Sequence, residues 1–360
     1  MKCNPKAPYN ELPTLPPKQE LETVRVLKQC IRSRTQLAEL EQAANFLPNK
    51  SLLINVLPLL EAQASSEIEN IVTTTDRLFR SSLLNQSPDA ATKEALNYRA
   101  ALYQSYQSLA DRPICTATAE RVCSVIKSRS MTIRKEAGTA LGSTISGDTI
   151  YTPPVGESVI REMLANWENF INQTTELDPL VVMAVAHYQF EAIHPFSDGN
   201  GRAGRVLNLL YLVQAGILSS PILYHSRGII RRKDDYYDLL RTVTFDQDWE
   251  AWILFILEVI EESAEWTNQK IRSIREYREE VKRDLKIKVP KIYSNELLDV
   301  LFEQPYCQIA DLVSAGIAKR QSASVYLKKL VEIGLLAEER VGRSALFIHE
   351  NYRNLLLSER

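Results

Sequence analysis

The sequence predicts a mainly α-helical protein with one β-hairpin in its core and a second, smaller domain at its C-terminus. Apolar residues recur at helical spacing over most of the chain, as Leu180, Ala184 and Tyr188 illustrate. Strand signals gather in two places only, a Gly/Thr/Ser-rich stretch at 138–154 and a stretch at 335–349. A chain of 360 residues is also too long for one typical compact domain, so we expect two or three.

The sequence pattern divides the chain into four parts. Residues 1–20 are rich in proline, which favours an extended arm on the surface. A helical pattern follows to about residue 109, with breaks near Pro48, Pro58 and Pro88. We expect an N-terminal arm and helical region (1–110), a central core (111–266), a charge-rich connecting helix (267–290) and a separate C-terminal domain (291–360).

Composition describes an ordinary soluble protein. Hydrophobic residues make up 45% of the chain, charged residues 24%, and the net charge is −2, so nothing favours binding to nucleic acid or an anionic membrane through overall charge. We find no apolar run of membrane-spanning length and no signal-peptide pattern, and we therefore expect a cytoplasmic protein. The five cysteines are scattered without zinc spacing, which predicts reduced thiols.

The most informative segment, 194–205, reads His-Pro-Phe-Ser-Asp-Gly-Asn-Gly-Arg-Ala-Gly-Arg. A helix should lead into it. Asp178-Pro179 has the pattern of a helix start, with an acidic N-cap followed by proline in the first turn. Pro195 argues that this helix ends near Ile193. His194 is therefore expected at the end of a packed helix, where a rigid element holds the imidazole.

A glycine turn and a second helix should follow the histidine. Glycine lets the backbone of Gly199-Asn200-Gly201 approach a ligand closely, and successive N–H groups in such a turn can bind an anion. The next helix would end near Gly216, and its N-terminus carries partial positive charge. Arg202 and Arg205 are three residues apart on it and so share a face. Arginine binds phosphate through a planar, bidentate fork.

Two further groups complete a site for phosphate chemistry. Asp198 is a single acid among positive groups, which is best explained as a ligand for Mg²⁺ or Mn²⁺ that also binds phosphate oxygens. His194 is a natural general base, because its ordinary pKa is near neutral. Taken singly, a histidine, two arginines or a Gly-Asn-Gly turn would be unremarkable structural features. Their combination predicts a metal-dependent transfer site that handles phosphate.

The segment resembles the signature of the Fic family, His-x-Phe-x-Asp/Glu-Gly-Asn-Gly-Arg-x-x-Arg, and meets it at every specified position. The resemblance implies a Fic-type helical core and transfer of AMP from ATP to a Tyr, Thr or Ser hydroxyl of a protein, including this protein itself, with release of pyrophosphate. His194 would take the hydroxyl proton, and Asp198 would hold the metal ion. Arg202 would bind the β-phosphate region and Arg205 the γ-phosphate.

The resemblance extends to the nucleotide contacts. The phosphates would lie on the segment formed by Asp198, Gly199, Asn200, Gly201, Arg202, Ala203, Gly204 and Arg205. Tyr236 and Tyr237 match a position where related proteins place tyrosines near the nucleotide. Adjacent helical residues point in different directions, so we do not expect both to contact the base, and two tyrosines packed in a core helix are an equal alternative.

The strand-forming stretch at 138–154 resembles the flap of the family, a hairpin that holds the target peptide by strand addition beside the active site. Its two strands would lie around Ser146-Gly147-Asp148, and the target peptide would contact Asp148, Thr149, Ile150 and Tyr151. An ordinary surface hairpin is the alternative.

A segment before the core resembles the inhibitory motif of Fic proteins, Ser/Thr-x-x-x-Glu-Gly/Asn, and Ser65, Glu69 and Asn70 match it. Without the resemblance it would be read as a solvated acidic helix. The implied mechanism is competition, in which Glu69 pairs with Arg205 where the γ-phosphate should bind. Such a pair predicts an autoinhibited enzyme.

The C-terminal domain resembles a winged helix, with helices at 295–302, 309–314 and 318–333 and a two-stranded wing at 335–349. Helix 318–333 would be the recognition helix if the domain binds DNA. From Lys286 to Arg360 there are eleven Lys/Arg against nine Asp/Glu, a net charge of about +2, which is a weak basis for DNA binding. A structural or partner-binding role is the alternative.

Three functions therefore remain open. The first is an autoinhibited protein adenylyltransferase, which the intact His194 and Asp198 favour. The second is a DNA-binding regulator or toxin-like module whose Fic core senses a nucleotide. The third is a phosphotransferase that binds ATP in the reverse orientation. Homodimers are common among relatives, so a homodimer is a further expectation from the resemblance, as are ATP and a hydroxyl-bearing protein as partners.

Overall fold

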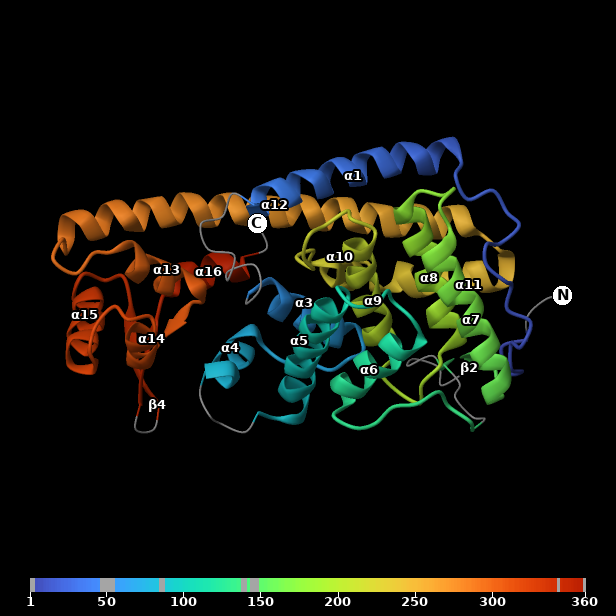
Figure 1. The fold of residues 1–360 in the computed structure, drawn as a ribbon, viewed down its shortest axis with the longest axis horizontal. Helices are drawn as coiled ribbons and strands as arrows, with labels where there is room; N and C mark the ends of the chain where they lie inside the picture. Colours follow the sequence, from blue (N-terminus) through green and yellow to red (C-terminus); the bar gives the residue numbers. More distant parts are fainter. Residues whose placement is uncertain are drawn as a thin grey trace.

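The computed structural model describes residues 4–45, 56–83, 88–136, 141–142, 149–341 and 344–358. A single long helix, α12 (Trp249–Lys288), runs along the whole molecule (Figure 1). Helix α1 (Val24–Asn45) packs along the first half of α12. The core helices lie below that half, and the C-terminal domain lies below the other half. The expectation of a mainly helical protein is confirmed.

Helix α12 continues across the expected boundary between core and connecting helix, and that boundary stays a prediction. We expected the connector to begin at residue 267, whereas the helix begins at Trp249 and runs through 40 residues. Neither glycine nor proline occurs in that stretch, so nothing in the backbone ends the helix at the proposed boundary. The second half of α12 packs against the C-terminal domain. Four apolar side chains of this half are buried: Ile271, Ile274, Val281 and Leu285.

The remaining helices of the N-terminal region and core are short and follow in order. Pro58 lies in the first turn of α3 and Asp89 caps α5, so the expected breaks near Pro58 and Pro88 are confirmed. The elements are α3 (Leu57–Ile68), α4 (Thr75–Leu83), α5 (Ala90–Ser108), α6 (Thr116–Lys127), α7 (Glu157–Gln173), α8 (Pro179–Ile193), α9 (Asn200–Gln214), α10 (His225–Arg231) and α11 (Lys233–Asp246).

Helix α8 is the centre of the core. It is apolar on almost every face, so it can be covered on all sides by α7, α9 and α12. Two tryptophans lock it in place through its backbone carbonyls. Trp167 Nε1 donates to Ala186 O at 3.0 Å, and Trp252 Nε1 donates to Ala184 O at 2.7 Å. The C-terminal end of α8, where the signature segment begins, is thereby held rigidly.

The expected flap is an antiparallel pair, β1 (Leu141–Gly142) and β2 (Thr149–Tyr151). Asp148 lies outside the described residues. Tyr151 is buried, and its hydroxyl donates to Ala192 O at 2.8 Å, which fastens β2 to the end of α8. The side chain of Ile150 is 39% exposed. One strand of the hairpin is therefore anchored beside the signature segment.

The proline-rich arm lies on the core, as expected, but its backbone forms turns and bends instead of one extended run. Leu12 and Leu15 are buried, and the side-chain amide of Asn166 pairs with the backbone N and O of Leu15 at 2.7 and 3.0 Å. Tyr9 N donates to Thr152 O at 3.0 Å, so the arm continues alongside the end of the flap.

The C-terminal domain has the three expected helices and the two strands of the expected wing. It also has a short first strand and a final helix that sequence reasoning missed. Its elements are α13 (Asn295–Glu303), β3 (Tyr306–Cys307), α14 (Ile309–Ser314), α15 (Arg320–Glu332), β4 (Ala337–Val341), β5 (Ser344–Ile348) and α16 (Glu350–Leu357). The strand order is β3-β5-β4, antiparallel throughout. Its classification as a winged helix, and DNA binding, stay predictions.

Side chains of α12 and α4 contact this domain and attach it to the rest of the molecule. Lys270 Nζ on α12 donates to Leu355 O and Ser358 O at 2.7 and 2.5 Å, which caps the C-terminal end of α16. Arg80 on α4 forms a bidentate pair with Glu339 on β4, with both distances 2.7 Å. The domain therefore contacts both the long helix and the N-terminal region.

Two expectations from composition can be compared with the structure. Within the described residues, no helix combines the length and apolarity that a membrane crossing requires. The described cysteines are all free thiols: Cys30, Cys115, Cys123 and Cys307.

Candidate active site

His194 lies at the end of α8, as the sequence predicted. It is the C-cap of the helix and adopts a left-handed conformation, with φ 49° and ψ 59°. Its Nδ1 lies 3.4 Å from Glu191 O. A carbonyl can only accept, so this contact places the proton of the neutral ring on Nδ1 and leaves the lone pair on Nε2. The ring is thereby prepared to accept a proton at Nε2.

Arg134 holds the loop that carries His194, a role that sequence reasoning missed. Its Nε donates to His194 O at 2.8 Å, Nη2 donates to Ile193 O at 3.2 Å, and its backbone N donates to Pro195 O at 2.9 Å. An arginine 60 residues earlier, in a segment without secondary structure, has no periodicity that could reveal such a role.

The turn after His194 is held by Asn200. Its Oδ1 accepts from Phe196 N and its Nδ2 donates to Phe196 O, both at 2.8 Å, and the side chain is buried. Gly199 has φ 83°, which glycine adopts without strain. We expected Gly199-Asn200-Gly201 to form a turn before the helix, whereas α9 already begins at Asn200. Both polar atoms of the Asn200 side chain bond to Phe196 within the loop. We therefore expect Asn200 to contact phosphate through its backbone N–H and not through its side chain.

We expect Asn200→Ala to destabilise the fold by about 2–3 kcal/mol, because it leaves the N–H and C=O of Phe196 without their buried partners. Urea denaturation of the variant beside the wild-type chain measures the difference. A loss below about 0.5 kcal/mol would show that water replaces the amide and that the loop does not depend on it.

Asp198 and Arg202 belong to a ring of four charges. Lys127 Nζ lies 2.7 Å from Glu94 Oε1 and 2.5 Å from Asp198 Oδ2. Arg202 pairs closely with Glu94 through Nη1 and reaches Asp198 Oδ1 at 3.3 Å. Partial burial opposes ionisation of Asp198, but Lys127 and Arg202 outweigh it and lower the pKa of the carboxyl below its ordinary value. Asp198 is therefore an anion at neutral pH.

Arg205 is buried and bound to the N-terminal region. Its Nε donates to Ser65 Oγ and its Nη2 to Ser65 O, both at 2.8 Å, and Nη2 also reaches Glu69 Oε1 at 2.9 Å. Burial opposes ionisation of Glu69, yet Arg205 holds the pKa of this carboxyl below its ordinary value. The structure therefore brings Glu69 onto the arginine, as the resemblance implied, and shows Ser65 as a further partner of Arg205.

The backbone conformation of Asn70 explains why the last position of the inhibitory motif is glycine or asparagine. Asn70 follows the end of α3 with φ 61°, a left-handed conformation that glycine and asparagine adopt most readily. Its Oδ1 accepts from Lys233 Nζ at 2.9 Å. Helix α3 itself is fixed by the buried Glu61, which accepts from Tyr98 OH at 2.9 Å and Ser226 N at 2.8 Å.

Gly201 lets Glu69 approach the backbone of α9. A Cβ at position 201 would collide with Glu69 Oε1 and lie 3.2 Å from its Cδ. The carboxylate therefore lies directly on the first turn of α9, where free N–H groups and the helix dipole favour an anion. The structure thus shows an anion in the place where the sequence predicts phosphate.

The two tyrosines of α11 behave differently. Tyr236 is buried and its hydroxyl lies 3.0 Å from His187 Nε2, whereas Tyr237 is 44% exposed. Burial and the charge of Glu69 raise the pKa of the Tyr237 hydroxyl, and the charge of Arg205 opposes this. Tyr237 is therefore close enough to the site to sense both charges. Of the pair, Tyr237 is the accessible one, and contact of either with a base stays a prediction. His187 is a packed, hydrogen-bonded histidine.

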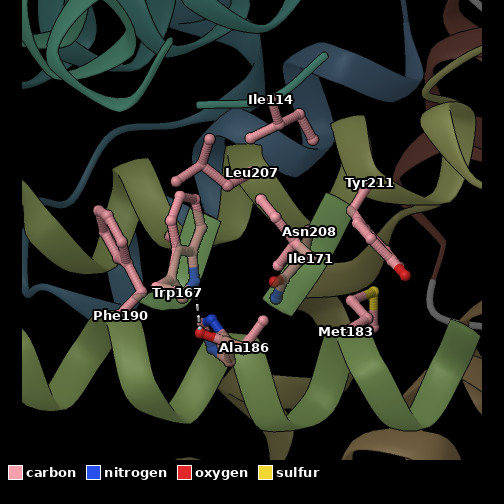
Figure 2. Close-up of a pocket in the computed structure, with 11 residues that line it drawn as sticks. Ile114, Trp167, Ile171, Met183, Ala186, Phe190, Leu207, Asn208 and Tyr211 are labelled. Carbon is pink, nitrogen blue, oxygen red and sulfur yellow. Dashed lines mark hydrogen bonds between the residues drawn. The ribbon is translucent and has the colours of Figure 1, made fainter. Parts of the chain in front are cut away.

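A small cavity lies in the core between α7, α8 and α9. Figure 2 shows side chains of α7, α8 and α9 around it, including Trp167, Phe190 and Asn208. Its volume of about 10 Å³ suits a single water and not a ligand. It is enclosed in the core, so the exposed loop at Asp198 is the better place for a substrate.

The residues fit a metal that is completed by its substrate. Within the described residues, no group of three or more His, Cys, Asp or Glu side chains is arranged to hold an ion. The carboxylate of Asp198 is half exposed, and the neighbouring carboxylate of Glu94 is occupied by Lys127 and Arg202. Mg²⁺ characteristically takes one or two carboxylates and fills its other positions with water and phosphate oxygens.

Three family models match the chain in the order of its domains. The Fic/DOC family N-terminal model matches residues 27–107, and the Fic/DOC family model matches residues 115–212, which contain the whole signature segment. The chain belongs to the Fic/DOC family. A third model, the C-terminal domain of SoFic-like protein adenylyltransferases, matches residues 277–352 of this Fic protein.

Curated relatives of the Fic protein carry the name of an activity. It is 32% identical over 110 residues to "Protein adenylyltransferase Fic" of Culex quinquefasciatus, which covers 30% of this chain and 21% of the relative. It is 38% identical over 65 residues to "Protein adenylyltransferase fic-1" of Caenorhabditis briggsae, covering 18% and 13%. The chain thus spans about a fifth or less of the length of these relatives.

Solved structures support the fold. A Fic family protein from Desulfovibrio desulfuricans G20 superposes with a TM-score of 0.58 at 18% identity, covering 91% of this chain and 96% of that one. Fic-1 (residues 134–508) from C. elegans gives 0.54 at 17% identity, covering 69% and 74%. At such identities the likeness concerns the fold alone.

We expect the low pKa of His194 to show in the pH dependence of AMP transfer, if the Fic protein catalyses it. Burial lowers the pKa of the imidazole to about 4, and the charge of Glu69 only partly opposes this. A base acts when it is neutral, which is above its pKa, so activity should extend to acidic pH. For Glu69→Gly, kcat/KM for ATP should stay constant down to roughly pH 5.5. A midpoint near the ordinary histidine value of about 6.5 would contradict the expectation.

Proposed function

We propose that this Fic protein is an autoinhibited, Mg²⁺-dependent protein adenylyltransferase that transfers AMP from ATP to a Tyr, Thr or Ser hydroxyl of a target protein, and to itself. The observation that carries the proposal is the arrangement of His194 and Arg205 around the N-terminus of α9, with Glu69 on the arginine. The names of the curated relatives agree with this reaction.

The reaction assigns one task to each group. Nε2 of His194 takes the proton of the target hydroxyl as its oxygen attacks the α-phosphorus. A new P–O bond forms, the bond from the α-phosphorus to the bridging oxygen breaks, and pyrophosphate leaves. Arg202, Arg205 and the N–H groups of α9 bind the β- and γ-phosphates and stabilise the charge that develops on them. Mg²⁺, held by Asp198, would neutralise phosphate charge when bound.

Glu69 explains the autoinhibition that we propose. The γ-phosphate and the carboxylate of Glu69 require the same face of Arg205, and Gly201 lets the carboxylate lie there. ATP then binds only with its phosphates displaced, and the α-phosphorus is turned away from His194. Release of Glu69 would allow the productive position. The flap would hold the target chain beside His194, with the exposed Ile150 as a contact.

The phosphate of ATP from which label enters protein distinguishes AMP transfer from phosphate transfer. Purified Glu69→Gly protein is incubated with Mg²⁺ and ATP labelled at the α- or the γ-phosphate, followed by gel analysis of the protein itself and of an added lysate. The proposal predicts label in protein from α-labelled ATP only. Label from γ-labelled ATP only would identify a phosphotransferase, and no label from either would contradict transfer to protein.

A further inference from the structure

Lys127 is a charged group at the site that the proposed reaction does not use. It lies at the end of α6, outside the signature segment, with a side chain only 15% exposed. Its ammonium contacts Asp198 Oδ2 at 2.5 Å, closer than the contact of Arg202 with the same carboxylate at 3.3 Å. Lys127 is therefore the main cationic partner of Asp198 in this state.

The position of the ammonium conflicts with a divalent cation. Mg²⁺ binds carboxylate oxygens at about 2.0–2.1 Å, so an ion on Asp198 Oδ2 would lie within about 5 Å of Nζ. Both charges are positive and the site is partly shielded from water, so the repulsion is strong. Lys127 and a metal ion cannot both occupy this oxygen as the structure places it.

Glu94 offers Lys127 a place to move. Its Oε1 already lies 2.7 Å from Nζ, so the ammonium keeps an anionic partner when it leaves Asp198. Gly199 keeps the path of the side chain open, since a Cβ there would lie 3.3 Å from Lys127 Cδ and 3.4 Å from its Cγ. The ring of four charges can thus lose one contact without leaving a lysine unpaired.

We propose that Lys127 is a positioning residue that occupies the cation position of Asp198 in the nucleotide-free protein and moves onto Glu94 when a divalent cation binds. The inference rests on the proposed role of Asp198 as the metal carboxylate. It follows that Lys127 weakens metal binding to the empty site. The metal then binds well only together with ATP, whose phosphates supply further ligands and attract the displaced ammonium.

Titration of the nucleotide-free, full-length protein with Mn²⁺ tests the proposal, with free Mn²⁺ measured by electron paramagnetic resonance. Lys127→Met should bind Mn²⁺ about tenfold more tightly than the wild type, because the competing charge is gone. Lys127→Arg keeps the charge and should bind like the wild type. Lys135→Met removes one positive charge from an exposed side chain that pairs with Glu157 at 3.5 Å, and should also bind like the wild type.

The same titration on Asp198→Asn, alone and with Lys127→Met, locates the metal. Weak binding in both variants, together with the gain in Lys127→Met, supports the inference. Unchanged affinity in Lys127→Met, while Asp198→Asn weakens binding, overturns the inference and leaves the proposed metal role of Asp198 intact. Mn²⁺ affinity that does not depend on Asp198 overturns both. Structural damage cannot imitate the expected result, since it would lower affinity, and thermal unfolding checks the fold of each variant.

Discussion

Glu69→Gly is expected to raise the rate of self-AMPylation on the order of a hundredfold, because breaking a buried ion pair of this kind shifts free energy by about 3 kcal/mol. The guanidinium of Arg205 is 1% exposed and holds Glu69 at 2.9 Å, so its release opens the face that the γ-phosphate requires. Labelling with α-labelled ATP at saturating Mg²⁺ gives the two rates directly.

Glu67→Gly is the matched control for this result. Glu67 lies on the same helix two residues earlier, is exposed, and makes no ion pair within the described part of the chain. The substitution introduces the same flexible residue and removes the same charge, but leaves the contact with Arg205. If Glu67→Gly labels as fast as Glu69→Gly, loosening of α3 explains the gain, and competition at Arg205 does not.

His194→Ala in the Glu69→Gly background is expected to lower the labelling rate by about a thousandfold, which is a typical contribution of a general base. ATP affinity, measured by calorimetry, should change little, since the imidazole is assigned to the hydroxyl and not to the phosphates. A variant that keeps more than about a tenth of the rate would show that another group accepts the proton.

The signature segment shows how much of the site could be predicted from the sequence. Asp178-Pro179 and Pro195 marked both ends of α8 correctly, and the position of His194 followed from them. The contact of Glu69 with Arg205 came from the family resemblance, because a pairing across 136 residues has no local signal. The end of α9 at Gln214 could also be predicted, because Gly216 follows it with φ 69°, a conformation that glycine adopts readily.

The residues that sequence reasoning missed act through tertiary contacts. Arg134 serves by donating to carbonyls of the His194 loop. Lys127 meets Asp198, and Glu94 meets Lys127 and Arg202, only because α5 and α6 pack against α9. The start of α12 was also misplaced. The sequence changes from apolar to charge-rich near Trp266, which suggested a boundary, but helix propensity continues through it and the backbone does not break.

The position of bound ATP tests the central claim most directly. A crystal structure of Glu69→Gly with His194→Ala, grown with ATP and Mg²⁺, should show the triphosphate along the first turn of α9. The account predicts the γ-phosphate on Arg205, where the Glu69 carboxylate lies in the present structure, and the α-phosphorus facing the place of the missing imidazole. A triphosphate bound elsewhere, with Arg205 still bound to Ser65 and no phosphate at α9, would contradict it.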